Sequence, residues 1–227
     1  MKRILSFIAP IFFTSVISSQ ELAQVTFSNS SHLSYFSFLT NGNVLVRVSA
    51  EGNILEWGTE VQSIRSSEYY APGLQPYLGR VEYYGKEADS VFRGKVKSIG
   101  TATITYYGYY EALEKAGKIR TIGTLVFDYF DQFADKAFRG KMKFAGRLPI
   151  EYFSSFEEEL QRGKLKSVSN SAITYYSFFD DKLIRGKIKS IGAVNYSWYT
   201  SLDAGRGGGL KSGSYRQNIA GITYIIW

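Results

Sequence analysis

The chain of 227 residues contains no cysteine and only one histidine, His32. The absence of cysteine excludes disulfides, thiolate metal sites and cysteine nucleophiles, and it also excludes the lipid-bearing cysteine of a bacterial lipoprotein. A single histidine supplies at most one member of a catalytic triad or of a multi-histidine metal site. These absences remove several common classes of enzyme and metal site.

Long apolar runs are also scarce, and the one that is present lies at the N-terminus. Lys2 and Arg3 precede a mainly apolar run over positions 4–17. A membrane-spanning helix needs about 20 apolar residues, so this run is too short for an anchor. The basic residues before the run, its apolar centre and the small residues that follow it are typical of a secretory signal peptide. We predict a signal peptide over residues 1–19, cleaved after Ser19 or, as a second choice, after Ala23, with no integral membrane span once it is removed.

Acidic residues are outnumbered, with 20 Asp and Glu against 27 Lys and Arg and a formal net charge of +7. This basic excess is modest, and an exported protein rarely meets nucleic acid. We therefore expect no nucleic-acid partner, and we expect an anionic surface polymer or another envelope protein instead. The predicted location is the periplasm, the cell surface or the extracellular space.

Proline is scarce as well, with 4 residues, whereas 18 tyrosines and 16 phenylalanines make the chain strongly aromatic and favour strands. The dominant feature is repetition, because five glycines stand 23 residues apart and each opens a similar segment. These glycines are Gly94, Gly117, Gly140, Gly163 and Gly186. A fixed period of this size indicates stacked units that bury their faces only against their neighbours.

Each repeat contains two blocks that are typical of strands. The first follows the glycine and alternates basic and apolar residues, as in "GKIKSIG" from Gly186. The second is β-branched and aromatic, as in "ITYY" from Ile173. About four residues separate the blocks, which predicts one β-hairpin per repeat. Degenerate copies extend from Gly52 to the C-terminus, so we predict an N-terminal strand segment over 20–51, a β-hairpin repeat domain over 52–227 and no separate second domain.

Two architectures fit a two-strand unit. In a β-solenoid, equivalent strands would stack about 4.8 Å apart and bring like charges into lateral contact. In an antiparallel meander, an aromatic strand separates equivalent basic residues, which then lie about 10 Å apart. We therefore predict an all-β fold, an elongated antiparallel β-meander of hairpin repeats of 23 residues, with the solenoid as the alternative.

The segments "GKIKSIG" and "ITYY", recurring every 23 residues over about Gly94 to Tyr199, resemble a divergent MORN-type repeat. The variant form of that repeat has a similar tyrosine-rich strand followed by a Gly-Lys-apolar-Lys segment. The chain is also similar to a group of secreted bacterial repeat proteins of unknown function. It lacks the regular Gly-x-Gly core of MORN repeats, so the resemblance implies an elongated antiparallel sheet and little about activity.

Acidic residues gather at two places, positions 157–159 and 180–181. Paired acids can cleave glycosidic bonds when they flank a cleft. Both clusters fall in the connections between repeats and close to basic residues, so local charge compensation at a solvated edge accounts for them. We predict a protein that is not an enzyme and has no catalytic residue, metal or cofactor.

The remaining candidate site is a periodic set of basic residues, each three positions after a repeat glycine. They are Lys97, Arg120, Lys143, Lys166 and Lys189. Interleaved with tyrosines, they would bind an anionic polymer through many weak, salt-sensitive contacts. The alternative is that they keep an exposed sheet soluble and discourage edge pairing.

We therefore predict an exported, non-catalytic repeat protein with a structural or surface-binding role. A second interpretation is an outer-membrane β-barrel or a membrane-associated envelope protein, which the aromatic content and the hairpin length suggest. Strands of such a barrel need about 9 to 11 residues with an unbroken apolar face. In this chain Asp131 would share a face with Phe127 and Tyr129, which disfavours the barrel.

Overall fold

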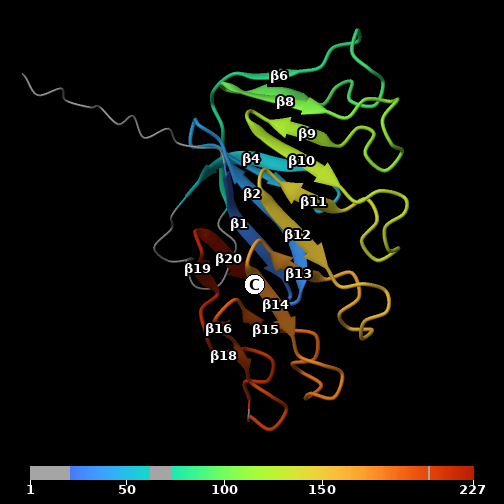
Figure 1. Ribbon diagram of the computed structural model, residues 1–227. Coiled ribbons are helices and arrows are strands. Elements are labelled where there is room, and N and C mark those ends of the chain that lie inside the picture. Colours follow the sequence, from blue (N-terminus) through green and yellow to red (C-terminus); the bar gives the residue numbers. More distant parts are fainter. Residues whose placement is uncertain (1–20, 62–72, 204) are drawn as a thin grey trace, which may run out of the picture.

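The computed structural model describes residues 21–61, 73–203 and 205–227, so the predicted signal peptide lies outside the described part of the chain. Within these ranges the chain forms strands and turns and no helix, which confirms the all-β class. The strands form a sheet of seven, a sheet of eleven and a two-stranded ribbon. Figure 1 shows the strands of the larger sheet following one another down the molecule.

The eleven-stranded sheet is the predicted meander. Each inner strand of this sheet pairs antiparallel with the strands before and after it in the chain, and the first and last strands form its edges. The strands are β6 (Val81–Tyr83), β7 (Val96–Ile99), β8 (Ala102–Tyr106), β9 (Ile119–Ile122), β10 (Leu125–Tyr129), β11 (Met142–Ala145), β12 (Leu148–Tyr152), β13 (Leu165–Val168), β14 (Ser171–Tyr175), β15 (Ile188–Ile191) and β16 (Val194–Asn195). Direct stacking of equivalent strands, as in a solenoid, does not occur in this sheet.

Two residues join the strands of each hairpin, where the sequence predicted about four. Ile99 pairs with Ala102 across Gly100 and Thr101, and Gly100 has a φ of 57°. A two-residue turn whose first residue has positive φ matches the twist of the flanking strands and favours glycine at that position. In the fourth repeat Ser169 occupies the same position with a φ of 51°. The pairing of the strands therefore maintains this turn even without glycine.

A β-bulge interrupts the pairing between one repeat and the next. Thr105 pairs with Thr121 and the following residue, Tyr106, pairs with Ile119, so Arg120 is an extra residue with no partner across the strands. The same shift recurs at the other four junctions between repeats. A bulge of this kind re-aims side chains. It lets both apolar residues of each first strand face the interior although they are three positions apart.

The seven-stranded sheet combines the two ends of the described chain. β1 (Glu21–Ser28) pairs antiparallel with β2 (His32–Leu39) and parallel with β20 (Ile222–Ile226). The other members are β3 (Leu45–Val48), β4 (Ile54–Glu60), β5 (Leu74–Pro76) and β19 (Arg216–Ile219), while β17 (Ser197–Trp198) and β18 (Leu210–Ser212) form the ribbon. The boundary predicted between positions 51 and 52 falls in the hairpin that joins β3 to β4. Residues on both sides of that boundary therefore share one sheet.

The core lies between the two large sheets. Phe38 of β2 contacts Phe127 of β10 edge to face, with ring centroids 4.8 Å apart, and both side chains are fully buried. A backbone hydrogen bond also joins the layers, because the N–H of Met142 donates to the carbonyl oxygen of Ala50 at 2.7 Å. The meander is therefore one layer of a two-layer structure, with one face packed inward and the other toward solvent.

Candidate functional site

The five basic residues predicted as a binding site all lie at the β-bulges of the meander. We call this set, Lys97, Arg120, Lys143, Lys166 and Lys189, the bulge stripe. Each is the extra residue at its junction, and all are exposed except Lys143, which is half-buried. Since equivalent residues are two strands apart, neighbours in the stripe are about 10 Å apart. The structure thus brings the predicted residues together in one row.

Four members of the bulge stripe lie over aromatic rings of neighbouring strand ends. The contacts, measured from the charged group to the ring centroid, are Arg120 to Tyr107 (5.5 Å), Lys143 to Phe130 (5.9 Å), Lys166 to Phe153 (5.8 Å) and Lys189 to Tyr176 (5.5 Å). A cation over an aromatic face is favourable by about 0.5–1 kcal/mol at exposed sites. The surface therefore alternates cationic groups and rings.

Most residues of the bulge stripe form no ion pair with the acidic residues near them in the described part of the chain. Among the described residues only one member has such a pair, Arg120 with Glu111 at 3.6 Å. Acids on the adjoining strands have other partners: Asp128 binds Lys115 at 2.6 Å, and Glu151 accepts a serine hydroxyl at 3.2 Å. Four amines of the stripe therefore remain available to an anionic partner.

The other lysine of each repeat, directly after the glycine, has an environment that the sequence analysis did not predict. We call Lys95, Lys118, Lys141, Lys164 and Lys187 the lysine ladder. Each donates from Nζ to the carbonyl oxygen of the corresponding glycine in the next repeat, or of Gly208 in the last. Each Nζ also lies 4.7–5.3 Å from the centroid of an aromatic ring in the core. The ladder therefore joins successive repeats.

Burial lowers the pKa of every member of the lysine ladder, because the ammonium loses hydration. The effect is largest at Lys164, where it lowers the pKa to about 8. In the sequence the two basic residues of each repeat look alike. Their order after the glycine is the only signal that distinguishes them.

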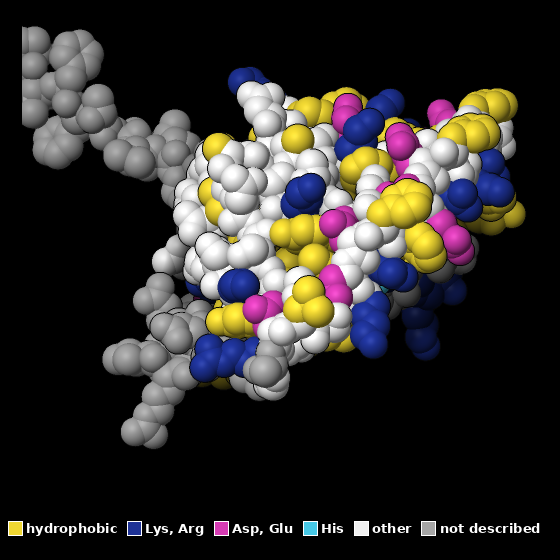
Figure 2. All heavy atoms as spheres, turned by 90° about the horizontal axis from the view of Figure 1, so that it is seen from below, with side chains coloured by type: hydrophobic (Ala, Val, Ile, Leu, Met, Phe, Trp, Pro, Cys, Tyr) yellow, Lys and Arg dark blue, Asp and Glu magenta, His cyan; other side chains and the backbone are white. Residues whose placement is uncertain are grey.

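Large apolar side chains project from the loops that connect the repeats. We call the equivalent residues Tyr110, Phe133, Phe156, Phe179 and Leu202, which are 87–97% exposed, the tip row. The loops are ordered by local hydrogen bonds: the N–H of Phe133 donates to Asp131 at 3.0 Å, and that of Phe179 donates to Ser177 at 3.2 Å. Figure 1 places these loops along one edge of the meander. Figure 2 shows hydrophobic side chains among charges of both signs on that side.

The acidic clusters lie in the same loops, and carboxylates of both clusters accept hydrogen bonds from backbone N–H groups of these loops. Asp181 accepts from the N–H of Ser201 in the next loop at 3.1 Å, and Glu158 accepts from the N–H of Phe178. Hydrogen bonds to Asp181, first among them that from the Ser201 hydroxyl, lower the pKa of its carboxyl group. Asp181 and Glu158 therefore act in loop packing through these hydrogen bonds.

Comparisons of the chain with protein families, with curated proteins and with solved structures found no match. The resemblance to MORN-type repeats stays a prediction. Within residues 21–61, 73–203 and 205–227, no group of three or more His, Asp and Glu side chains is placed to hold a metal ion. The same part of the chain contains no helix long and apolar enough to cross a membrane.

Proposed function

We propose that this chain is an exported, non-catalytic repeat protein that binds an extended anionic surface polymer along the bulge stripe. The observation that carries the proposal is the recurrence of one arrangement, a basic residue re-aimed by a β-bulge, at five successive junctions. Charges at a regular spacing of about 10 Å suit a partner that is itself a repeating chain. Each contact is weak, and binding strength comes from engaging several together.

The export part of the proposal leads to a prediction about the mature N-terminus. Cleavage after Ser19 would leave β1 whole, whereas cleavage after Ala23 would remove Leu22, which is 2% exposed and pairs with Phe38. N-terminal sequencing of the protein from the native envelope or medium should therefore read from Gln20. A chain that begins at Met1 in the cytosolic fraction would contradict export.

Replacing all five stripe residues with glutamine should reduce retention on an acidic polysaccharide at least about tenfold at low salt, because the contacts act together. The single change Lys189→Gln should alter retention about twofold or less. Retention of the wild type should fall as salt screens the charges. The measurement is elution volume across a salt series.

A matched variant controls for net charge. Lys86, Arg93, Lys182, Arg206 and Lys211 are exposed and lie outside the bulge stripe, so changing them to glutamine removes the same charge. This control should keep most of the retention. If the wild type shows no salt-dependent retention, or if the stripe variant is retained equally well, the stripe serves only solubility.

A second candidate, a membrane-associated envelope protein, is favoured by the tip row. Aromatic side chains that project from ordered loops suit the interface between lipid and water. In that case, changing Phe133, Phe156 and Phe179 to serine should abolish co-sedimentation with phosphatidylglycerol vesicles and leave retention on polysaccharide unchanged. The variant with five glutamines in the bulge stripe separates the two candidates, because it should lose binding to the polymer before it loses binding to the vesicles. Wild-type protein that stays in the supernatant would remove this second candidate.

A further inference from the structure

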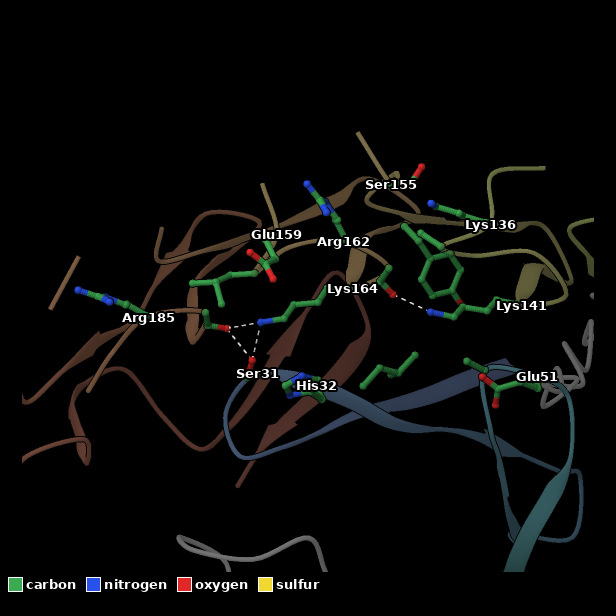
Figure 3. A pocket seen from close by; sticks show the side chains of 17 residues that line it. Ser31, His32, Glu51, Lys136, Lys141, Ser155, Glu159, Arg162, Lys164 and Arg185 are labelled. Carbon is green, nitrogen blue, oxygen red and sulfur yellow. Dashed lines mark hydrogen bonds between the residues drawn. The ribbon is translucent and has the colours of Figure 1, made fainter. Parts of the chain in front are cut away.

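A cleft of about 760 Å³ opens where the turns of the seven-stranded sheet meet the loops of the meander. The turn before β2 and the turn between β3 and β4 form one side, through residues such as Ser31, His32 and Glu51. Strands and loops of the second to fifth repeats, mainly the third and fourth, form the other side (Figure 3). None of the bulge stripe residues lines this cleft, so it is separate from the proposed polymer surface.

Two members of the lysine ladder, Lys141 and Lys164, line the cleft. The Lys164 Nζ donates to the Ser31 hydroxyl oxygen at 2.6 Å and to the Gly186 carbonyl oxygen at 2.7 Å, and Lys141 Nζ donates to Gly163 at 2.7 Å. Among the described residues neither amine has a carboxylate within ion-pair distance. An ammonium group has three N–H donors, so each keeps at least one for a ligand.

The charge around the cleft favours an anion. Five basic side chains line it, Lys136, Lys141, Arg162, Lys164 and Arg185, against two acids, Glu51 and Glu159. Figure 3 shows Lys164 directed toward Ser31 and His32 inside the cleft, and Arg162 and Arg185 directed toward its outer side. Lys141 and Lys164 are half-buried, whereas Arg162 and Arg185 are exposed, and among the described residues neither lysine has a counter-ion at ion-pair distance. An oxyanion would supply it.

The hydroxyl of Tyr152 is a second, independent indication of a ligand. Tyr152 lines the cleft and is 5% exposed, and its hydroxyl oxygen is buried without any hydrogen-bond partner in the described part of the chain. The equivalent hydroxyls of Tyr129 and Tyr175 each donate to a strand carbonyl oxygen at 2.8 Å. Buried polar groups are nearly always hydrogen-bonded, so an exception at one repeat requires a reason. A ligand atom in the cleft provides one.

We propose that this cleft is a binding site for a carboxylate or phosphate group, held by the ammonium of Lys141 and the hydroxyl of Tyr152 and reached from the other side by Lys164. The Lys141 Nζ lies 5.1 Å from the ring centroid of Tyr152, so the two residues that would hold the oxyanion are direct neighbours. A hydrogen bond from a charged donor to an oxyanion is stronger than one between neutral groups, and the hydrogen bond from the phenol hydroxyl would orient the ligand. The ligand is an acidic sugar or a phosphate ester.

Calorimetric titration of the full mature chain with glucuronic acid and with glycerol 3-phosphate tests the site. Saturable binding of either probe is the expected result, and the tighter probe identifies the source of the oxyanion. Tyr152→Phe should weaken binding about fivefold to tenfold, since it removes one hydrogen bond to a charged group. Tyr175→Phe is the matched control and should bind the probes as the wild type does.

The Tyr152→Phe variant keeps the test informative if Lys141 or Lys164 variants fail to fold, because the hydroxyl that it removes has no partner in the described structure. The variant with five glutamines in the bulge stripe should bind both probes normally, which separates this site from the polymer surface. Absence of saturation with both probes up to about 10 mM would overturn the proposal. Equal affinities of Tyr152→Phe and wild type would also overturn it.

Discussion

Replacing Phe127 with alanine should lower the free energy of unfolding by about 3–5 kcal/mol. The side chain is fully buried in β10 and contacts Phe38 of β2 edge to face at 4.8 Å between ring centroids. Removing it deletes apolar contacts on both sheets and leaves a cavity that a packed β-core cannot readily close. The aromatic pair itself contributes about 0.5–1.5 kcal/mol beyond the area that it buries.

The neighbouring residue gives the control for this prediction. Val126 is 54% exposed on the outer face of the same strand, so Val126→Ala should change stability by no more than about 0.5 kcal/mol. Urea denaturation, with the midpoint and slope compared among variants, is the measurement. If Phe127→Ala and Val126→Ala cost similar amounts, the two sheets do not share the core that the structure shows. A double variant with Phe38→Ala should fall short of additivity, because the residues contact each other.

The period of 23 residues, together with the residue types inside each repeat, predicted the meander. A repeat fixes which segments are equivalent, and β-branched and aromatic blocks fix which of them are strands. The placement of like charges then favoured the meander over the solenoid. All of these arguments concern strands that are adjacent in the sequence, and in a meander most paired strands are adjacent in the sequence.

The seven-stranded sheet could not be predicted in the same way. Its β1 pairs in parallel with β20, and almost the whole described chain separates these strands. No periodic signal connects them, because the pairing depends on how two finished segments meet in space. For the same reason the Phe38–Phe127 contact and the cleft beside Lys164 had no counterpart in the sequence analysis.

The candidate site shows a second limit of prediction from the sequence. The sequence identified the basic residues of the bulge stripe, but the two basic residues of each repeat were expected to alternate with apolar residues along one strand. The bulge changes that alternation, so Lys143 lies on the outer face while Lys141 donates to the Gly163 carbonyl oxygen at 2.7 Å. A one-residue shift in strand pairing depends on the opposite strand, so the residues of one strand do not predict it. The unpartnered hydroxyl of Tyr152 also could not be predicted, because its equivalents in three other repeats, Tyr106, Tyr129 and Tyr175, are tyrosines as well.

The stability of the folded chain should fall steeply above pH 10. Tyr129, Tyr152 and Tyr175 are 1–5% exposed, and burial raises the pKa of each phenol well above its usual value. An unfolded tyrosine ionises near pH 10. Above that pH the unfolded chain releases protons that the folded chain keeps, so stability decreases with pH. Each such phenol adds about 1.4 kcal/mol per pH unit to this slope.

The lysine ladder acts in the opposite direction and at lower pH. Its pKa values are lowered, to about 8 at Lys164, while an unfolded lysine titrates near pH 10.4. Between these values the unfolded chain binds more protons than the folded chain, so stability rises with pH. Because these side chains are only partly buried, solvent screening limits the rise to about 1 kcal/mol. The predicted profile therefore increases gently from about pH 8 to pH 10 and then collapses.

Two phenylalanine variants test which groups cause the collapse. Tyr175→Phe removes one titrating phenol, so the slope above pH 10 should fall by about 1.4 kcal/mol per pH unit, and the lost bond to the Leu165 carbonyl oxygen should cost about 1 kcal/mol at pH 7. Tyr152→Phe should reduce the slope equally and cost less at pH 7, since its hydroxyl has no hydrogen-bond partner within the described chain. Tyr110→Phe, at a side chain that is 97% exposed, should leave the slope unchanged. Urea midpoints from pH 7 to pH 11.5 measure all three variants. If the slopes of the two buried variants match the wild type, alkaline unfolding has another cause and the buried tyrosines titrate alike in both states.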